Sequence, residues 1–440
     1  MKINILCFVI SLLTQSLLMA QDYNVLTTDR AIRLALDHNY GIKLSHNNVR
    51  IAKNNAHLFN SNKLPTLTAN AGVNYNLDNT EAAFSNGNST VLDGAESSRY
   101  NASLDLNYII FDGLGRSYNF KKLKATHQLS KLEARETIEQ TILQLYTIYY
   151  SVAEALENKA ATLKTLKLSK QRLLRAQYQF DYGQNTKLAV LNANVDINND
   201  SILLLNSKQQ LSNYKRDLNL VLGNQLKPNF TIDTLVTLGN LYNKETLLKE
   251  AISNNTRLLQ INKNIDINNL TLKSVKSAFL PTVGLVGRYG WNKNNNNPAS
   301  FVSVFTNTGL SGGVNLRWSL FDGGNTITQV NNAQISIETQ KLKKEQLLIN
   351  IDRDFNNLWS SYQNTLQVYQ LQSQNIVTAT TNFKRTLEKF KIGQIDSITY
   401  RQAQLNLFNA QLSKNKLKYQ IKLIELQLLK LCGVLLDRYI

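Results

Sequence analysis

Residues 64–77 read LPTLTANAGVNYNL, and residues 280–291 read LPTVGLVGRYGW. The shared Leu-Pro-Thr start therefore recurs after 216 positions. Further along, Phe111-Asp112-Gly113 recurs as Phe321-Asp322-Gly323 after 210 positions. Nearly constant offsets of this kind indicate an internal repeat, and an internal repeat constrains the whole fold. We therefore expect one structural unit that is present twice.

The offset of 210 also maps Gly183 onto Gly393 and Gly223 onto Gly433. A length change of six falls between the Leu-Pro and Phe-Asp-Gly sequences. Such a change is tolerated at a loop tip, so exposed loops are expected at 78–98 and 293–309. The predicted organisation is a first repeat over 21–223, a linker over 224–244, a second repeat over 245–433 and a tail over 434–440.

Four segments alternate apolar and polar residues, the period of a β-strand. They cover residues 66–77, 100–111, 282–292 and 310–321. Strands of this length suit a tilted membrane span, but closing a bacterial barrel takes about eight strands or more. Four strands therefore predict a barrel shared between copies, and three copies would supply twelve. The alternative is two amphipathic hairpins in an ordinary soluble sandwich.

The remaining segments carry apolar residues at alternating steps of three and four, which is the period of coiled-coil helices. A helix over 117–182 would span about 100 Å at 1.5 Å per residue, too long for a compact domain. Two shorter helices, stacked end to end, would match it in length. Helices are predicted at 30–62, 117–182 and 186–222, and again at 246–279, 326–391 and 396–432.

The N-terminus is typical of an export signal. Lys2 precedes an interrupted apolar run over 3–18, and Ala20 supplies the small residue expected before cleavage. The predicted signal peptide is 1–20; a membrane anchor is the alternative, but the run is short for one. The chain has 440 residues, a net charge of +18 and 43% hydrophobic residues. Export makes nucleic acid an unexpected partner despite that charge.

These features together resemble the TolC-type outer-membrane efflux channels over essentially the whole mature chain. The resemblance rests on the order helix, Leu-Pro, strand, loop, strand, Phe-Asp-Gly, long helix, Gly turn, helix, written twice. It implies an α+β membrane protein: a homotrimer with a 12-stranded β-barrel in outer-membrane lipid of a Gram-negative bacterium. A periplasmic α-helical barrel would continue it and dock onto a periplasmic adaptor of an inner-membrane pump. The expected function is a passive duct for efflux or type I secretion.

Two residue types fit the positions where helices meet strands. Pro65 and Pro281 end helices, because proline lacks the N–H and disfavours helix at the preceding residue. Gly113 and Gly323 free the backbone for the return from strand to helix. Aromatic residues near the strand ends would form a girdle at the membrane interfaces or would pack on the sheet. They are Tyr75, Tyr108, Tyr289, Trp291 and Trp318.

The resemblance also places a periplasmic tip at the two turns between long helices. Its predicted adaptor contacts are Gly183, Gln184, Asn185, Gly393 and Gln394; bare turns without a partner are the alternative. Relatives often narrow the pore with Asp about six and nine residues after the second-repeat Gly, where this chain has Thr399 and Gln402. A basic or mixed gate is therefore expected. Its candidates are Lys187, Asp396, Thr399, Arg401 and Gln402.

No catalytic motif is found. The four His residues lie in the first repeat without clustered Cys or carboxylates, so no metal, cofactor or enzyme activity is expected. Cys432 is the one cysteine of the predicted mature chain and excludes an intrachain disulfide. Competing readings are a periplasmic coiled-coil adaptor and a soluble coiled-coil scaffold. The windows 159–216 and 369–426 hold 19 Lys and Arg residues against six acids, so most of the charge excess lies near the tip.

Overall fold

The computed structural model describes residues 25–227, 229–238 and 243–439, so the predicted signal peptide lies outside the described residues. The chain divides into two compact units. Unit 1 holds the residues up to Asn47, Leu132–Leu259 and Gln346 onward; unit 2 holds Asn48–Lys131 and Gln260–Glu345. Each unit takes segments from both repeats, so the repeats do not fold as two separate bodies. Corresponding segments of the two repeats are instead found in the same unit.

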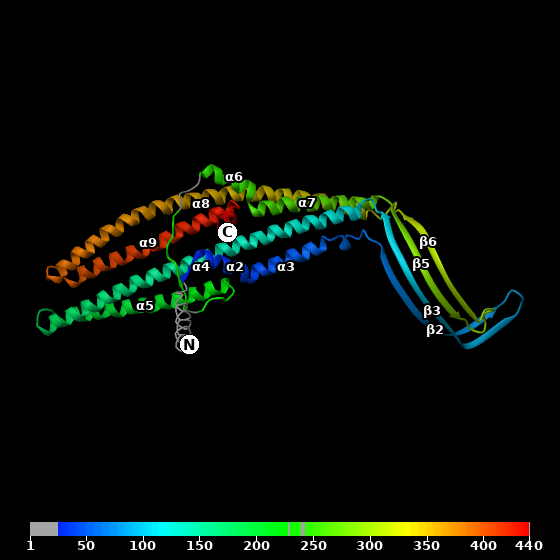
Figure 1. Ribbon diagram of the computed structural model, residues 1–440, viewed down its shortest axis with the longest axis horizontal. Helices are drawn as coiled ribbons and strands as arrows, with labels where there is room; N and C mark the ends of the chain where they lie inside the picture. Colours follow the sequence, from blue (N-terminus) through cyan, green and yellow to red (C-terminus); the bar gives the residue numbers. More distant parts are fainter. Residues whose placement is uncertain (1–24, 228, 239–242, 440) are drawn as a thin grey trace, which may run out of the picture. The chain divides into compact units, whose positions relative to one another are not determined.

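Unit 1 is helical and is built on two antiparallel hairpins, α4 with α5 and α8 with α9 (Figure 1). Short helices α2, α6 and α10 and a two-stranded parallel sheet of β1 and β4 complete it. Among the described residues, no helix is both long and apolar enough to cross a bilayer. Four helices, α3, α4, α7 and α8, have residues in both units. The bounds are α2 Thr28–His38, α3 Tyr40–Asn55, α4 Gly115–Asp181, α5 Lys187–Val221, α6 Lys244–Asn254, α7 Thr256–Lys276, α8 Asn325–Lys391, α9 Ser397–Leu431, α10 Leu435–Tyr439, β1 Val25–Leu26 and β4 Thr231–Ile232.

The predicted helices 30–62 and 246–279 are interrupted at Asn39 and at Asn255, and their α-helical parts end early, at Asn55 and Lys276. The Asn39 amide donates to the Val221 carbonyl at 2.9 Å, and the Asn255 amide donates to the Leu431 carbonyl at 2.8 Å. Each Asn thus satisfies a carbonyl at the end of α5 or α9, a group that has no partner within its own helix. The two contacts are equivalent in the two repeats, so the duplication extends to individual hydrogen bonds.

Gly223 and Gly433 follow these helix ends in the left-handed conformation, both with a φ of +69°. A Cβ on Gly223 would lie 2.6 Å from the His38 carbonyl oxygen, and one on Gly433 would lie 2.0 Å from the Asn254 carbonyl oxygen. Glycine is therefore required twice over, by backbone conformation and by close approach. These glycines let a short helix pass directly over the end of a long one.

The core of unit 1 surrounds a cluster of tyrosines on α4 and α9. The buried Tyr149 hydroxyl lies 2.7 Å from the Leu26 carbonyl oxygen and 3.0 Å from that of Asp233. It therefore bonds to β1 and to the residue that follows β4, and holds both segments against α4. Tyr150 stacks on Tyr419 with ring centroids 5.6 Å apart, which joins α4 to α9.

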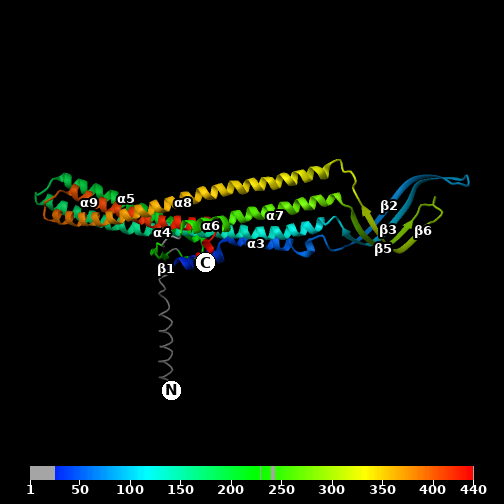
Figure 2. The ribbon, with the colours of Figure 1, turned by 90° about the horizontal axis from the view of Figure 1, so that it is seen from above.

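Unit 2 contains a four-stranded antiparallel sheet in the order β2-β3-β5-β6 (Figure 2). The strands are β2 Thr66–Ala83, β3 Ser89–Phe111, β5 Thr282–Asn295 and β6 Val304–Arg317. The β2–β3 hairpin is longer than the β5–β6 hairpin and extends past it (Figure 2). Much of the predicted exposed loop 78–98 is therefore strand, because cross-strand pairing continues to Ala83 and Ser89 beyond an irregularity at Asp78.

The predicted strand 310–321 is wrong at both ends: it begins at Val304 and stops at Arg317. Arg317 pairs with Thr282, and the next position on the partner strand is Pro281, which has no N–H for a further ladder bond. Trp318 therefore lies outside the sheet, where its indole N–H donates to the Phe279 carbonyl at 3.0 Å. Tyr75, Tyr108, Tyr289 and Trp291 are in strands with exposed side chains, and the girdle stays a prediction.

The helix–strand junctions hold the predicted Pro and Gly residues. Pro65 and Pro281 follow short 3₁₀ turns, η1 Leu58–Asn60 and η2 Ser277–Phe279. Gly113 has a φ of +65°, and a Cβ there would lie 2.6 Å from the Ser277 carbonyl oxygen. Gly323 has a φ of +69° in open surroundings, so only its conformation favours glycine.

Candidate functional site

The tip of unit 1 consists of two turns of the same design, residues 182–186 and 392–396. Gly183 has a φ of +70° and Gly393 a φ of +77°, as expected for glycine just past a helix end. The N–H groups of Gln184 and Gln394 donate to the carbonyls of Gln179 and Lys389, at 2.7 and 2.9 Å. In the first turn the Asn185 side chain adds two further bonds, since its amide donates to the Gln179 side-chain oxygen at 3.2 Å and its oxygen accepts from the Thr186 N–H at 2.8 Å.

The start of α9 is capped more firmly than the start of α5. The Asp396 carboxylate accepts a hydrogen bond from the Thr399 N–H at 2.7 Å, whereas Thr186 makes no side-chain cap at α5. The hydrogen bond from the Thr399 backbone is the main reason that the pKa of Asp396 lies below its usual value. Asp396 is therefore a helix cap as well as a predicted gate residue.

A groove of about 640 Å³ runs between the two turns and the adjoining helices. It collects six of the predicted adaptor and gate residues: Gln184, Asn185, Gly393, Asp396, Arg401 and Gln402. The predicted residues Gly183, Gln394, Lys187 and Thr399 are at the tip but do not line it. The Lys187 ammonium instead lies 5.3 Å from the centre of the Phe180 ring. Residues far apart in the sequence thus form one concave surface with neutral amides and mixed charges.

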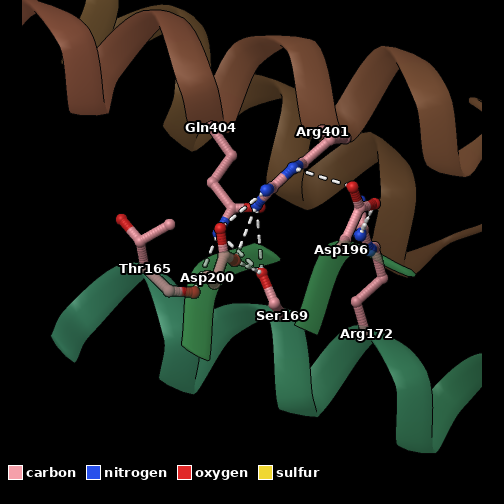
Figure 3. Close-up of polar contacts among 7 residues, drawn as sticks. All are labelled: Thr165, Ser169, Arg172, Asp196, Asp200, Arg401 and Gln404. Carbon is pink, nitrogen blue, oxygen red and sulfur yellow. Dashed lines mark hydrogen bonds and ion pairs between the residues drawn. The ribbon is translucent and has the colours of Figure 1, made fainter. Parts of the chain in front are cut away.

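Below the groove, a polar network joins α9 to α4 and α5 (Figure 3). Arg401 donates from both terminal nitrogens to the Asp200 carboxylate, at 2.7 and 2.9 Å. Ser169 on α4 donates to the same carboxylate at 2.6 Å. Only 1% of the Asp200 side chain and 12% of the Arg401 side chain are exposed. Paired, hydrogen-bonded charges are the form in which such groups are tolerated inside a protein.

A second ion pair extends the network toward the tip (Figure 3). Arg172 on α4 pairs with Asp196 on α5, and Arg401 Nε lies 3.5 Å from Asp196 as well. Gln404 donates to the Thr165 carbonyl at 3.0 Å. The two arginines and two aspartates balance in charge, so the hairpins are held together without a net charge at this level.

The predicted gate residues point in different directions within this arrangement. Arg401 is largely buried and paired, whereas Thr399 and Gln402 are exposed in the single chain. Arg175 gives a further link between the hairpins, because it donates to the Lys391 carbonyl at 2.8 Å and lies over the Phe390 ring. The tip is thus a pair of hairpins with defined cross-links.

Sequence reasoning missed the partners of Arg401 in this network. Comparing the repeats at the offset of 210 would have shown them, since Asp200 corresponds to Ala410 and Arg401 corresponds to Leu191. A position that is charged in one repeat and apolar in the other departs from the duplicated pattern. Among the described residues, no group of His, Cys, Asp and Glu side chains could hold a metal ion.

The family model described as "Outer membrane efflux protein" matches residues 31–224 and 247–434. The chain is 25% identical over 319 residues to outer membrane protein TolC of Vibrio cholerae, covering 69% of each protein. It is 20% identical over 425 residues to SilC of Salmonella typhimurium, described as a probable outer membrane lipoprotein, covering 92% of this chain and 85% of SilC.

Solved structures with a similar fold include the CmeC outer membrane channel of Campylobacter jejuni. The TM-score is 0.80 at 16% identity, over 93% of this chain and 86% of CmeC. The VceC outer membrane protein of Vibrio cholerae gives a TM-score of 0.74 at 14% identity, over 92% of this chain and 96% of VceC.

Proposed function

Because the chain belongs to the outer membrane efflux protein family, we propose that three copies form a passive duct to the cell exterior. As a family member it is an outer-membrane efflux channel of a Gram-negative bacterium with a periplasmic helical barrel. We propose that it receives substrates from a periplasmic adaptor and an inner-membrane pump, in efflux or in type I secretion.

The two free edges of the sheet carry the trimer proposal. The order β2-β3-β5-β6 is antiparallel throughout, so the edge strands β2 and β6 run in opposite directions. The β2 edge of one copy can therefore pair antiparallel with the β6 edge of the next. Unpaired edges are not tolerated in lipid, and four strands are too few to close alone. Three copies would give twelve strands without a free edge.

An apolar stripe on α5 supports association of the helices. Its residues are spaced by three, four and seven positions, so they share one helix face, and they are exposed in the single chain. An exposed apolar stripe at coiled-coil spacing favours a covering helix from a neighbouring copy. The stripe consists of Leu188, Leu191, Val195, Ile202 and Leu205.

The groove at the tip is the proposed adaptor contact. Gln184 and Asn185 line it from the first hairpin and Gly393 from the second. Neutral amides offer both donors and acceptors to a partner helix. Thr399 and Gln402, with Lys187, Asp396 and Arg401, form the proposed pore gate, which would be basic or mixed in charge rather than acidic. The alternative, a periplasmic adaptor or scaffold, leaves the sheet edges and its exposed apolar face without a partner.

The test uses the full mature chain purified from outer membranes in detergent. We expect the mass of three chains by light scattering and discrete conductance steps in planar bilayers. Ile202→Lys, in the part of the stripe that lies outside the groove, should weaken the trimer, while Ser85→Lys in the exposed turn between β2 and β3 serves as a control for added charge. A monomer that needs no detergent and conducts no ions would overturn the proposal. A photo-crosslinker at Gln184, which lines the groove, or at the predicted contact Gln394 beside it should then capture the adaptor in whole cells.

A further inference from the structure

We propose that Arg288 forms an anion-binding site on the polar face of the sheet and makes the duct prefer anions over cations. The inference rests on the proposed barrel, in which this face lines the water-filled lumen. The expected ligands carry carboxylate or phosphate groups, because two oxygens of such a group can accept parallel hydrogen bonds from a guanidinium.

The strand register places Arg288 on the polar face. It lies opposite Asp105 on β3 and opposite Ser311 on β6. Cross-strand partners share one face of a sheet, and successive residues alternate between faces. Its neighbour Tyr289 is therefore on the opposite, apolar face, where it pairs with Leu104 and Leu310.

A hollow of about 650 Å³ opens around Arg288 on this sheet. Thr68, Asn70 and Asn107 line it from β2 and β3, and Ser311 and Gly313 line it from β6. A Cβ on Gly313 would meet only one atom within 4 Å, the Val286 Cγ2, at 3.9 Å. Glycine leaves this space empty where a side chain would fit, so a small anion can approach the guanidinium from the lumen.

The guanidinium is only weakly paired within the chain. Its one ion-pair partner among the described residues is Asp105, with Arg288 Nε 3.5 Å from Oδ1. The other oxygen of Asp105 already accepts from Asn70 at 2.7 Å and from Ser103 at 2.8 Å. Arg288 carries five N–H donors and its side chain is 57% exposed. Most of its binding capacity is therefore available to a ligand.

The charges on the same face favour anions. We consider the part of the sheet between the Ser98–Asn295 pair and the helix–strand junctions. The charged residues that the register places on the same face there are Arg99, Asp105, Arg288 and Arg317. That is three positive charges against one negative charge per copy. The next acid on β2, Asp78, pairs with Ala95 beyond this region. Trimer symmetry would repeat the positive excess three times around a narrow lumen, where one sign of charge concentrates its counter-ions.

The experiment measures the reversal potential of single trimeric channels in a potassium chloride gradient. The reversal potential of wild type should be shifted from zero toward the equilibrium potential of chloride. In Arg288→Gln the reversal potential should lie closer to zero. Lys293→Gln removes the same charge from the same strand, but Lys293 pairs with Tyr100 on the opposite face, so the potential should not change. Arg288→Lys should keep the sign of the potential. Asp105→Asn should increase the anion preference.

Inorganic pyrophosphate tests the site directly. It should reduce the chloride current of wild type at low concentration, and Arg288→Gln should need an about tenfold higher concentration, as for one lost charge-assisted hydrogen bond. A cation-preferring wild type, or equal block of both proteins, would overturn the inference while leaving the channel function standing. Absence of any conductance from wild type would instead contradict the proposed duct and this inference with it.

Discussion

Arg401 and Asp200 face each other through two parallel hydrogen bonds although they come from opposite repeats. The corresponding positions are Leu191 and Ala410, so the pair has no counterpart in the other half. The duplication thus gives two similar helical hairpins. The ion pair that holds these hairpins together has no equivalent at the corresponding positions. This is where the symmetry of the sequence is broken by a specific interaction.

Removing Arg401 should destabilise the tip strongly. In Arg401→Met, the buried Asp200 carboxylate keeps only Ser169 as a donor, and an uncompensated buried charge costs about 3–5 kcal/mol. The double variant Arg401→Met with Asp200→Leu should recover much of this loss, because no charge is then left buried. Thermal unfolding of the purified trimer followed by circular dichroism measures both effects.

Arg353 provides the matched control for this experiment. It pairs with Asp354, but its side chain is 61% exposed, and exposed pairs contribute less than about 1 kcal/mol. Arg353→Met should therefore leave the unfolding temperature nearly unchanged. Equal losses for Arg353→Met and Arg401→Met would show that the tip network adds no stability of its own.

Strand and helix types could be predicted because each follows from a local period in the sequence. The breaks at Asn39 and Asn255 could not, since Asn39 is fixed by the Val221 carbonyl, 182 positions away. The strand over 89–98 was missed for a similar reason: its sequence has a loop composition, and pairing with β2 makes it a strand. Local composition cannot report a bond to a distant backbone group.

For the candidate site, the turns could be located and the cross-links could not. Gly183 and Gly393 mark helix-to-helix turns through their conformation, which is a local requirement. Arg401 is a predicted gate residue, but its partner Asp200 lies in the other repeat at a distance of 201 positions. The pairing depends on how the two hairpins fold against each other, which no local pattern in the sequence contains.

Gly433→Ala should be far more damaging than Gly393→Ala. Both glycines are left-handed, which costs an alanine about 1–2 kcal/mol. A Cβ at Gly433 would also collide with Asn254 backbone atoms at 2.0 and 2.5 Å, whereas one at Gly393 would meet nothing within 4 Å. We expect little trimer from Gly433→Ala and near-normal yield from Gly393→Ala, as judged by size-exclusion chromatography. Similar yields would contradict the close approach.

Glu139 should make stability fall as pH rises from about 4.5 through the raised pKa of its carboxyl group. Its side chain is 2% exposed, and burial raises its pKa above the usual 4.5 despite hydrogen bonds from Arg135 and Thr256. Between 4.5 and the raised pKa the folded chain holds more protons than the unfolded chain, so stability decreases with pH there. Glu139→Gln should flatten this part of the profile. An unchanged profile, measured by unfolding at successive pH values, would exclude Glu139 as its source.

Cys432 should be unreactive until the protein unfolds. It is fully buried, its thiol lies 3.2 Å from the Leu247 carbonyl oxygen, and burial raises its pKa to about 12. Thiolate is the reactive form, so almost none is present at pH 8. A maleimide should label the native trimer negligibly and the denatured chain at one thiol per chain, because cleavage after Ala20 would remove Cys7. Two labelled thiols would show that the predicted signal peptide is retained, and rapid native labelling would show that α9 opens near its end.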